Sequence, residues 1–539
     1  FLAAGLTAGL VIQAWVIMAG NAKLAPIAGV TLPFVSYGGS SLLTSFIALG
    51  LLLRMSSQTS DVPSRMSDVG SPQRSTVTPP PIRPHRRTSL LHLACVLSLA
   101  LALLTAMCGY WAIVRADDLR ARADNPRRVL YEQRIVRGRI LDREGRALAD
   151  VEVADDGTVT RRYPVPEAAP AVGYASLRYG TGGIEAAFDA QLRGEAGRTD
   201  WQAAWEEVVH RPPQGRDVQL TLDAGLQIQA QRELEDHIGA AVLMDAASGE
   251  ILALASSPTF NPQRLDDEWE EQREDPSAPL VNRATQGLYQ PGVALQSIIV
   301  AEALSKGLAD LATPTSNITA TVWVNGTPVG CSATRSGLRT LGDAYAAACP
   351  APFANLAGWL GAAGVDEAVE RWALTTPPPL EIPTQAANWE AEVLSTTTAL
   401  QAEAIGQGRL TVSPLQMACV AGTLANQGKM PVPRLVLRVQ HAEGGWQEHP
   451  GAGEPRAVLQ SDDARALLAA WQRYDEDGVA GHWGPAVAGE GRPPHAWFIG
   501  VAPATGEMRY AIAVLIEHAA APEAAVRIGR ALLKAASTQ

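Results

Sequence analysis

The chain has 539 residues, a length that suggests about three to four structural units rather than one. Its formal net charge of -11 at pH 7 argues against a general nucleic-acid-binding protein, because affinity for phosphate requires clustered lysine and arginine. Hydrophobic residues make up 47% of the chain and are concentrated near its start, which predicts a membrane-attached protein with a large water-soluble part.

We predict that residues 1–54 form transmembrane helices. Their two apolar runs, residues 1–19 and 40–53, carry no charge. The second run reaches membrane-spanning length only if residues 32–37 also enter the bilayer, where Pro33 would interrupt the helix. An ordinary helical hairpin is the alternative.

A third apolar run, residues 90–114, predicts another transmembrane helix. Arginines between residues 83 and 87 precede it, which places that side in the cytoplasm by the positive-inside tendency. Residues 55–89 are rich in Ser, Thr and Pro and are predicted to be a disordered cytoplasmic linker. The sequence therefore predicts a multi-pass plasma-membrane protein in which residues 115–539 lie outside the cytoplasm.

The C-terminal part shows the pattern of an α+β domain. Residues 241–244 and 251–255 are apolar runs on either side of "DAASG", whose Asp, Ser and Gly favour a hairpin turn. Residues 496–501 and 509–516 are predicted to be further strands, and residues 523–535 an amphipathic helix. Strand pairs with helices between them indicate an antiparallel sheet flanked by helices.

Five cysteines do not make a disulfide framework. Cys95 and Cys108 lie in the third apolar run, and Cys419 lies in a predicted helix. Only Cys331 and Cys349 are placed to pair, and nothing in their spacing demands a bond. The sequence leaves open whether they form a disulfide.

Residues 29–43, "GVTLPFVSYGGSSLL", combine glycine and proline in an apolar context. The stretch resembles the last-helices motif of the SEDS family, the FtsW/RodA-like polymerases that build peptidoglycan glycan strands from a lipid-linked disaccharide. The residues of this motif are Gly29, Pro33, Ser36, Gly38 and Gly39. The match covers only the C-terminal end of that family, whose essential acidic residue lies upstream, so this chain is not expected to polymerise glycan alone.

Residues from about 90 to 539 resemble class B penicillin-binding proteins, the peptidoglycan transpeptidases that work with SEDS polymerases. The motifs include "RGRILDREGRALA" from Arg137, "VGYASLRYGTGGIEAAFDAQLRG" from Val172 and "HAWFIGVAP" from His495. The resemblance implies a mainly β pedestal or dimerisation-like domain over residues 115–215. It implies a transpeptidase-like α+β domain over residues 216–539.

The family's three catalytic motifs are degenerate in this chain. The Ser-x-x-Lys positions hold Val293 and Gln296, and the sequence contains no Ser-x-x-Lys anywhere. The Ser-x-Asn positions hold Ala348 and Pro350 in "ACP". After the "VAG" at residues 487–489, the place of Lys-Thr-Gly is expected to hold the pair Glu490-Gly491.

These losses predict a pseudo-transpeptidase that scaffolds or activates the SEDS glycosyltransferase fused before it. The implied partners are that polymerase in cis, peptidoglycan or its lipid-linked precursor, the membrane and other cell-wall or division proteins, with no cofactor, metal ion or nucleic acid. An active D,D-transpeptidase using Ser297 or Cys349 is the main alternative. A binding module for peptidoglycan peptides is a third, which Glu490 opposes by repelling a carboxylate. The sequence does not distinguish elongation from division.

Overall fold

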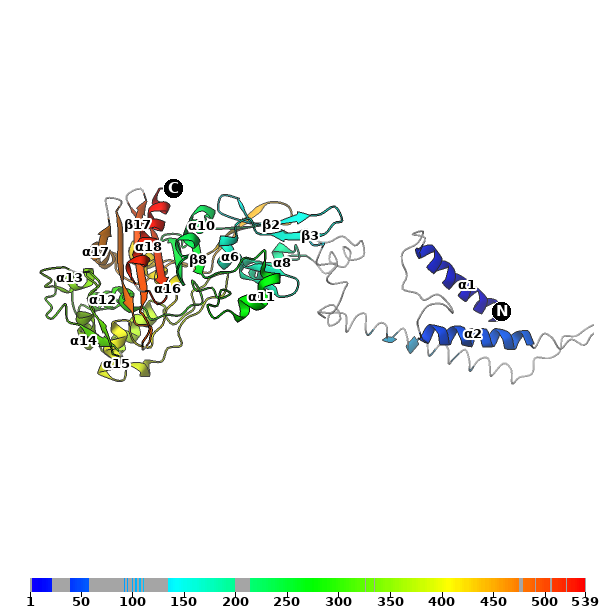
Figure 1. Ribbon diagram of the computed structural model, residues 1–539, viewed down its shortest axis with the longest axis horizontal. Helices are drawn as coiled ribbons and strands as arrows, with labels where there is room; N and C mark the ends of the chain where they lie inside the picture. Colours follow the sequence, from blue (N-terminus) through cyan, green and yellow to red (C-terminus); the bar gives the residue numbers. More distant parts are fainter. Residues whose placement is uncertain are drawn as a thin grey trace, which may run out of the picture. The chain divides into compact units, whose positions relative to one another are not determined.

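The computed structural model describes residues 2–21, 39–57, 134–198 and 214–538, apart from 325, 334, 475–477, 490, 505–506 and 520, together with isolated positions between 92 and 110. The chain divides into two compact units, Phe1–Gly109 and Tyr110–Gln539 (Figure 1). Gly29, Pro33, Ser36 and Gly38 lie outside the described residues, as do the expected linker beyond residue 57 and most of the third apolar run.

Among the described residues of the first unit are helices α1 (Leu2–Asn21) and α2 (Gly39–Ser57), which contact each other. Both apolar runs of the N-terminal segment are therefore helical, as the sequence predicts. Val11, Trp15 and Phe46 expose more than half of their surface on these helices. Within the described residues, no helix combines the length and apolar character that a membrane crossing needs.

The second unit begins with a pedestal built on a mixed sheet. Its strands lie in the order β13 (Trp446–Glu448), β12 (Val436–Gln440), β6 (Val218–Leu220), β1 (Ile140–Leu141), β2 (Ala147–Val153) and β3 (Val159–Arg162). β1 and β6 pair in parallel, and the other neighbours pair antiparallel. Because β12 and β13 come from the C-terminal part of the chain, this sheet extends beyond the predicted 115–215 segment.

Short elements cover one end of the pedestal sheet. They are η2 (Pro166–Ala168), α6 (Ala169–Val172), β4 (Tyr174–Ser176), β5 (Gly180–Gly182), α7 (Gly183–Ala187) and α8 (Asp189–Leu192). Gly173 and Gly183 have φ values of 78° and 62° where β4 and β5 approach α6, so this compact arrangement depends on glycine.

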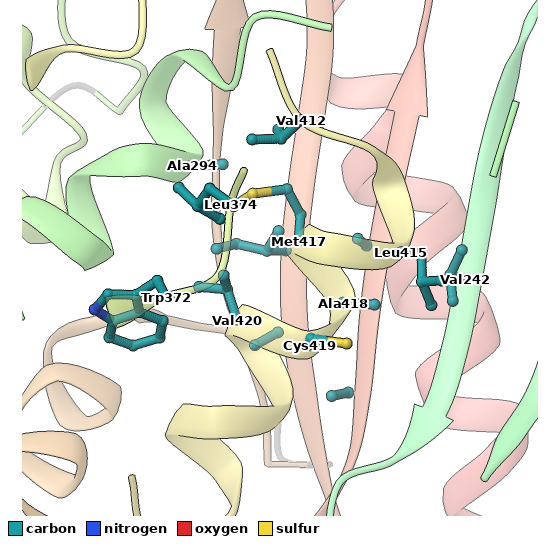
Figure 2. Packing of buried hydrophobic residues seen from close by; sticks show 14 of the residues in the cluster. Val242, Ala294, Trp372, Leu374, Val412, Leu415, Met417, Ala418, Cys419 and Val420 are labelled. Carbon is teal, nitrogen blue, oxygen red and sulfur yellow. The ribbon is translucent and has the colours of Figure 1, made fainter. Parts of the chain in front are cut away.

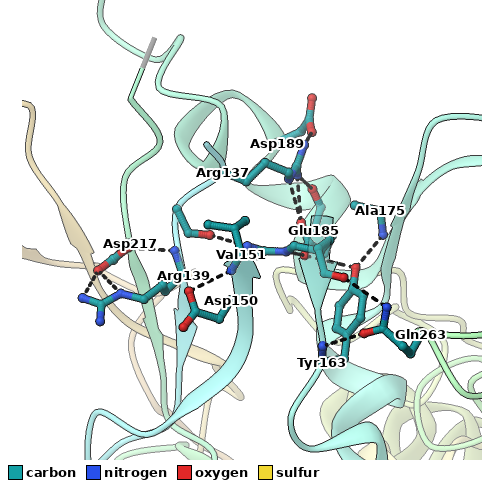
Figure 3. Close-up of polar contacts among 12 residues, drawn as sticks. Arg137, Arg139, Asp150, Val151, Tyr163, Ala175, Glu185, Asp189, Asp217 and Gln263 are labelled. Carbon is teal, nitrogen blue, oxygen red and sulfur yellow. Dashed lines mark hydrogen bonds and ion pairs between the residues drawn. The ribbon is translucent and has the colours of Figure 1, made fainter. Parts of the chain in front are cut away.

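A buried carboxylate joins the pedestal strands to these short helices (Figure 3). Glu185 is fully buried and accepts hydrogen bonds from Arg137 Nη2 at 2.8 Å and from Arg161 Nε at 2.6 Å. The Tyr163 hydroxyl also donates to Glu185, at 3.3 Å. Burial raises the pKa of Tyr163, and the Glu185 charge raises it further, so this hydroxyl stays protonated as a donor.

The larger domain is built on an antiparallel sheet. Its described strands lie in the order β15 (Gln472–Tyr474), β16 (Val479–Ala486), β17 (His495–Ala504), β18 (Glu507–Ile516), β7 (Gly239–Asp245) and β8 (Ile251–Ser257). Every neighbouring pair is antiparallel. The hairpin of β7 and β8, the two later strands and the antiparallel sheet all confirm the sequence prediction.

Helices cover both faces of this sheet. α10 (Ala224–Glu233) and the predicted closing helix, α18 (Glu523–Ser537), pack on one face, whereas α12 (Gln296–Ser305) and α16 (Pro414–Ala425) belong to the core on the other. Neighbouring residues of β17 alternate between the faces: Trp497 joins the core of α16, and Phe498 joins that of α18. Figure 2 shows Leu415 on the side of α16 toward Val242 of β7, and Met417 on the side toward Leu374.

The remaining elements lie outside the two six-stranded sheets, and α11 among them packs against β4 of the pedestal. They are α11 (Leu265–Glu274), η3 (Gly292–Leu295), β9 (Val322–Val324), β10 (Thr327–Val329), α13 (Leu341–Ala346), α14 (Pro350–Arg371), η4 (Ala391–Leu394), α15 (Thr397–Ala404), β11 (Lys429–Met430), β14 (Arg456–Ala457) and α17 (Ser461–Ala470). A capping box between Thr340 and Asp343 begins α13, and one between Ser413 and Gln416 begins α16. These caps satisfy backbone donors at helix starts close to the site described next.

Candidate active-site cleft

Val293, at the expected nucleophile position, lies in the single turn η3 just before α12. Gly292 has φ 53°, and its N–H donates to the Gly406 carbonyl at 2.8 Å. A Cβ at position 292 would lie 2.6 Å from the Pro485 carbonyl oxygen, so only glycine fits there. The turn has the geometry to present side chain 293 to the sheet, yet that side chain is apolar and only 2% exposed.

Strand β16 passes directly beside Val293. A Cβ built on Gly484 would lie 2.6 Å from Val293 Cγ2 and would also overlap the hydroxyl oxygen of Ser332. The β16 backbone can approach this closely only because residue 484 is glycine. Three segments therefore meet at one point: η3, β16 and the segment that carries Ser332.

Gln296, at the expected base position, contacts His482 of β16. Gln296 Oε1 and His482 Nε2 are 3.2 Å apart, and both side chains are buried. Burial lowers the pKa of His482 to about 3, although a hydrogen bond to the Val293 backbone opposes the shift. The imidazole is thus neutral near pH 7. Among the described residues, Gln296 Nε2 has no hydrogen-bond partner.

Ser297, the first alternative nucleophile, is part of a buried network. Its Oγ lies 2.7 Å from the Tyr345 hydroxyl, which accepts a hydrogen bond from Trp471 Nε1 at 2.5 Å. Ser297 and Tyr345 are both completely buried. Burial raises the pKa of Tyr345, so this phenol does not supply a base that could activate the serine.

The second-motif positions lie between α13 and α14. Ala348 has φ 53° and is 3% exposed, and Pro350 is the first residue of α14. Cys349, the second alternative nucleophile, forms a disulfide with Cys331. The bond that the sequence left open is therefore present, and it removes the Cys349 thiol from nucleophilic chemistry in this state.

The third-motif position requires a correction. Glu490 lies outside the described residues, and Gly491 lies in the connection between β16 and β17, after β16 has ended. The strand residues that face η3 and α12 are instead His482 and Gly484. The sequence contains "VAG" three times, at residues 420–422, 479–481 and 487–489, and the copy that ends at Gly481 leads into "HWG". This copy lies at the start of β16, which pairs with the "HAWFIG" strand β17.

The assembled cluster is closed and neutral. Val293, Gln296 and Ser297 are each at most 2% exposed, and the hydrogen bonds of Gln296 and Ser297 run to side chains inside the cluster. In the part of the chain that the structure describes, no group of three or more His, Cys, Asp or Glu side chains is placed to hold a metal ion. The geometry suits packing better than acyl transfer.

The fold, and the order of the motif positions along the chain, are those of the penicillin-binding protein transpeptidase family. The chain belongs to this family: the model of the penicillin binding protein transpeptidase domain matches residues 239–534. The penicillin binding protein A dimerisation domain matches residues 137–218, and the cell cycle protein family of FtsW, RodA and SpoVE matches residues 1–61. These matches confirm the fusion that the sequence predicts and place the chain in peptidoglycan biosynthesis.

Similar proteins include peptidoglycan D,D-transpeptidase PbpA of Mycolicibacterium smegmatis, 32% identical over 492 residues, which span 83% of this chain and 99% of that protein. Peptidoglycan D,D-transpeptidase MrdA of Escherichia coli is 30% identical over 298 residues, 49% of this chain and 45% of that protein. The penicillin G acyl-enzyme complex of penicillin-binding protein A from M. tuberculosis has a TM-score of 0.65 at 27% identity, covering 74% of this chain and 99% of that one.

Proposed function

We propose that residues 115–539 act without acyl transfer and scaffold or activate the SEDS-type glycosyltransferase to which they are fused. The observation that carries the proposal is the contact at the nucleophile and base positions. Val293 has no nucleophilic atom, and Gln296 is held by a neutral His482. A covalent intermediate has no atom through which to form at this point.

The backbone around residue 293 supports the same conclusion. Acyl transfer needs N–H donors directed at the oxyanion that develops next to the nucleophile. The strand residue that follows Gly484 is Pro485, which has no N–H, and the Gly292 N–H is already bonded to Gly406. A serine restored at position 293 alone would therefore have fewer N–H donors for the oxyanion than acyl transfer needs.

The alternative of an active D,D-transpeptidase rests on relatives such as PbpA, one of which is known as a penicillin G acyl-enzyme. In this chain its candidate nucleophiles are compromised, since Ser297 is buried against Tyr345 and Cys349 is cross-linked. The third possibility, a peptide-binding module, is opposed by the burial of Val293, Gln296 and Ser297. Neither alternative gains a specific observation from the described residues.

The proposed membrane arrangement has independent support from the disulfide. Disulfides persist in oxidising compartments, so the Cys331–Cys349 bond fits a domain outside the cytoplasm. With residues 1–54 and 90–114 as membrane helices, the chain would be a multi-pass protein of the plasma membrane. Fusion would then hold the pedestal beside the polymerase at high effective concentration.

Glycan polymerisation from lipid-linked precursor tests the proposal, using the chain with the upstream SEDS helices restored. We expect removal of residues 115–539 to lower the polymerisation rate by about tenfold or more, a coupling of typical allosteric size. Addition of penicillin to the complete chain is the control and should leave the rate unchanged. Equal polymerisation with and without residues 115–539 would contradict the activator role.

A further inference from the structure

The segment Cys331–Ala333 packs beside Val293 and Gly484. Ser332 Oγ occupies the space beside Gly484 and Val293, because a Cβ on Gly484 would overlap this oxygen. The Ser332 hydroxyl is buried and has no hydrogen-bond partner among the described residues. Its place in the cleft is therefore not fixed by a hydrogen bond of its own, and the neighbouring attachments must hold it there.

Three attachments join this segment to the second-motif positions. Cys331 is disulfide-bonded to Cys349, the Ser332 N–H donates to the Ala348 carbonyl at 3.4 Å, and the Ala333 N–H donates to the Ala347 carbonyl at 3.1 Å. The Ser332 hydrogen bond is long, the Ala333 hydrogen bond is of ordinary length, and each contributes only a modest net free energy. The disulfide is the strongest of the three.

The packing around the disulfide is a small cluster apart from the main core. It consists of Ile318, Ala344, Ala347 and Cys349, with Cys331 and Leu338 packed against it. Most of these side chains are small and bury little apolar area, which limits the free energy that holds the segment in place. Without the cross-link, the segment depends on this cluster and on two backbone hydrogen bonds.

We propose that the Cys331–Cys349 disulfide is a reducible cross-link that holds residues 331–333 beside Val293. A dithiol reductant opens it by attacking Cys331. Cys349 is completely buried, whereas Cys331 is only partly buried, so Cys331 Sγ is the sulfur within reach. The incoming thiolate bonds to Cys331 and expels the Cys349 thiolate, which takes a proton. The second thiol of the reductant then displaces Cys331, leaving two protein thiols and an oxidised cyclic disulfide.

Reduction would release residues 331–333 and uncover Val293 and Gly484. The inference rests on the proposed non-catalytic role, because a site covered by a cross-linked segment is compatible with a domain that performs no acyl transfer. The two can fail separately. A penicilloyl adduct on the chain contradicts the proposed function alone. Amide exchange near Val293 that is unchanged by reduction of the disulfide contradicts the reducible cross-link alone.

Hydrogen exchange on the full chain in detergent micelles, with and without dithiothreitol, tests whether the disulfide holds residues 331–333 in place. We expect amides of residues 292–297 and 331–333 to exchange about tenfold faster or more after reduction, while β7 and β18 are unchanged. Cys331→Ser should reproduce the effect without reductant. Cys419→Ala, which removes a buried free thiol elsewhere, is the matched control and should not.

Two outcomes would overturn the proposal. Unchanged exchange at residues 292–297 would mean that the segment stays in place without the bond. A uniform rise that includes β7 and β18 would mean that the bond stabilises the domain generally. Brief exposure to glutathione, followed by peptide mapping, checks the direction of attack: the mixed disulfide should be on Cys331, and an adduct confined to Cys349 would contradict the assigned order.

Discussion

Gln296 Oε1 and His482 Nε2 lie 3.2 Å apart, and both side chains are buried. This contact joins α12, which carries the expected base position, to strand β16. In this chain the two positions hold a neutral amide and a neutral imidazole, and they stabilise each other instead of activating a nucleophile.

The contact predicts a pH-dependent stability. Burial lowers the pKa of folded His482 to about 3, below the value of about 6.5 for an unfolded histidine. Between these values the unfolded state binds more protons, so stability rises with pH from 3 to 6.5 and is lost as pH falls. We expect His482→Gln to reduce the difference in unfolding free energy between pH 4 and pH 7, measured by chemical denaturation.

His441→Gln is the matched control for this test, because His441 is exposed on the pedestal side of β12. It should leave the pH dependence of the wild type unchanged. His495, whose pKa burial lowers to about 4, contributes to both proteins and cancels in the comparison. An identical pH profile for His482→Gln and wild type would show that His482 is not the titrating group.

The Ser297–Tyr345–Trp471 network predicts coupled substitutions. Tyr345→Phe leaves two buried groups without their partner and should lower stability by roughly 2–4 kcal/mol, whereas Ser297→Ala should cost about 1 kcal/mol. In a double-mutant cycle the combined loss should be smaller than the sum, because both changes remove the same hydrogen bond. Strict additivity would contradict the contact.

Partial restoration of the motifs should not restore acylation. A chain carrying Val293→Ser, Gln296→Lys and His482→Lys still has Pro485 beside the nucleophile and Ser332 over it. Two lysines would also be placed in a buried site, which should lower stability by several kcal/mol, on the order of the cost of unpaired buried charges. We expect no penicilloyl mass on this variant. An adduct would refute the argument from the missing N–H.

The pedestal network predicts a sharp contrast between two carboxylates. Glu185→Gln leaves Arg137 and Arg161 without their shared counter-ion in a buried site and should cost about 3–5 kcal/mol. Asp189→Asn removes another partner of Arg137. The Asp189 side chain is 38% exposed, so the loss of stability should be about 0–1 kcal/mol. Denaturant unfolding of the pedestal measures both, and similar losses would contradict the central role of Glu185.

Sequence reasoning succeeded where the signal was local. The β7–β8 hairpin follows from apolar runs around a turn in which Asp245 accepts hydrogen bonds from Ala247 and Ser248, and helix α18 follows from its amphipathic period. The motif losses at Val293 and Gln296 are visible in the letters alone. Family resemblance supplied the order of the domains.

It failed where the information lies in long-range pairing. The third motif is predicted after the "VAG" at residues 487–489, whereas the strand that pairs with β17 is β16, which begins with the copy at residues 479–481. Strands β12 and β13 complete the pedestal sheet from far along the chain, which no local pattern indicates. The role of Ser332 was missed as well, since only the approach of β16 to Val293 reveals it.

The central claim is that this penicillin-binding domain forms no acyl-enzyme. Intact-mass analysis of the full chain after incubation with a penicillin tests it most directly. The account predicts an unchanged mass, because residue 293 is a buried valine and Cys349 is cross-linked. An added penicilloyl mass, mapped by peptide analysis to Ser297 or to another residue of the site, would contradict the claim.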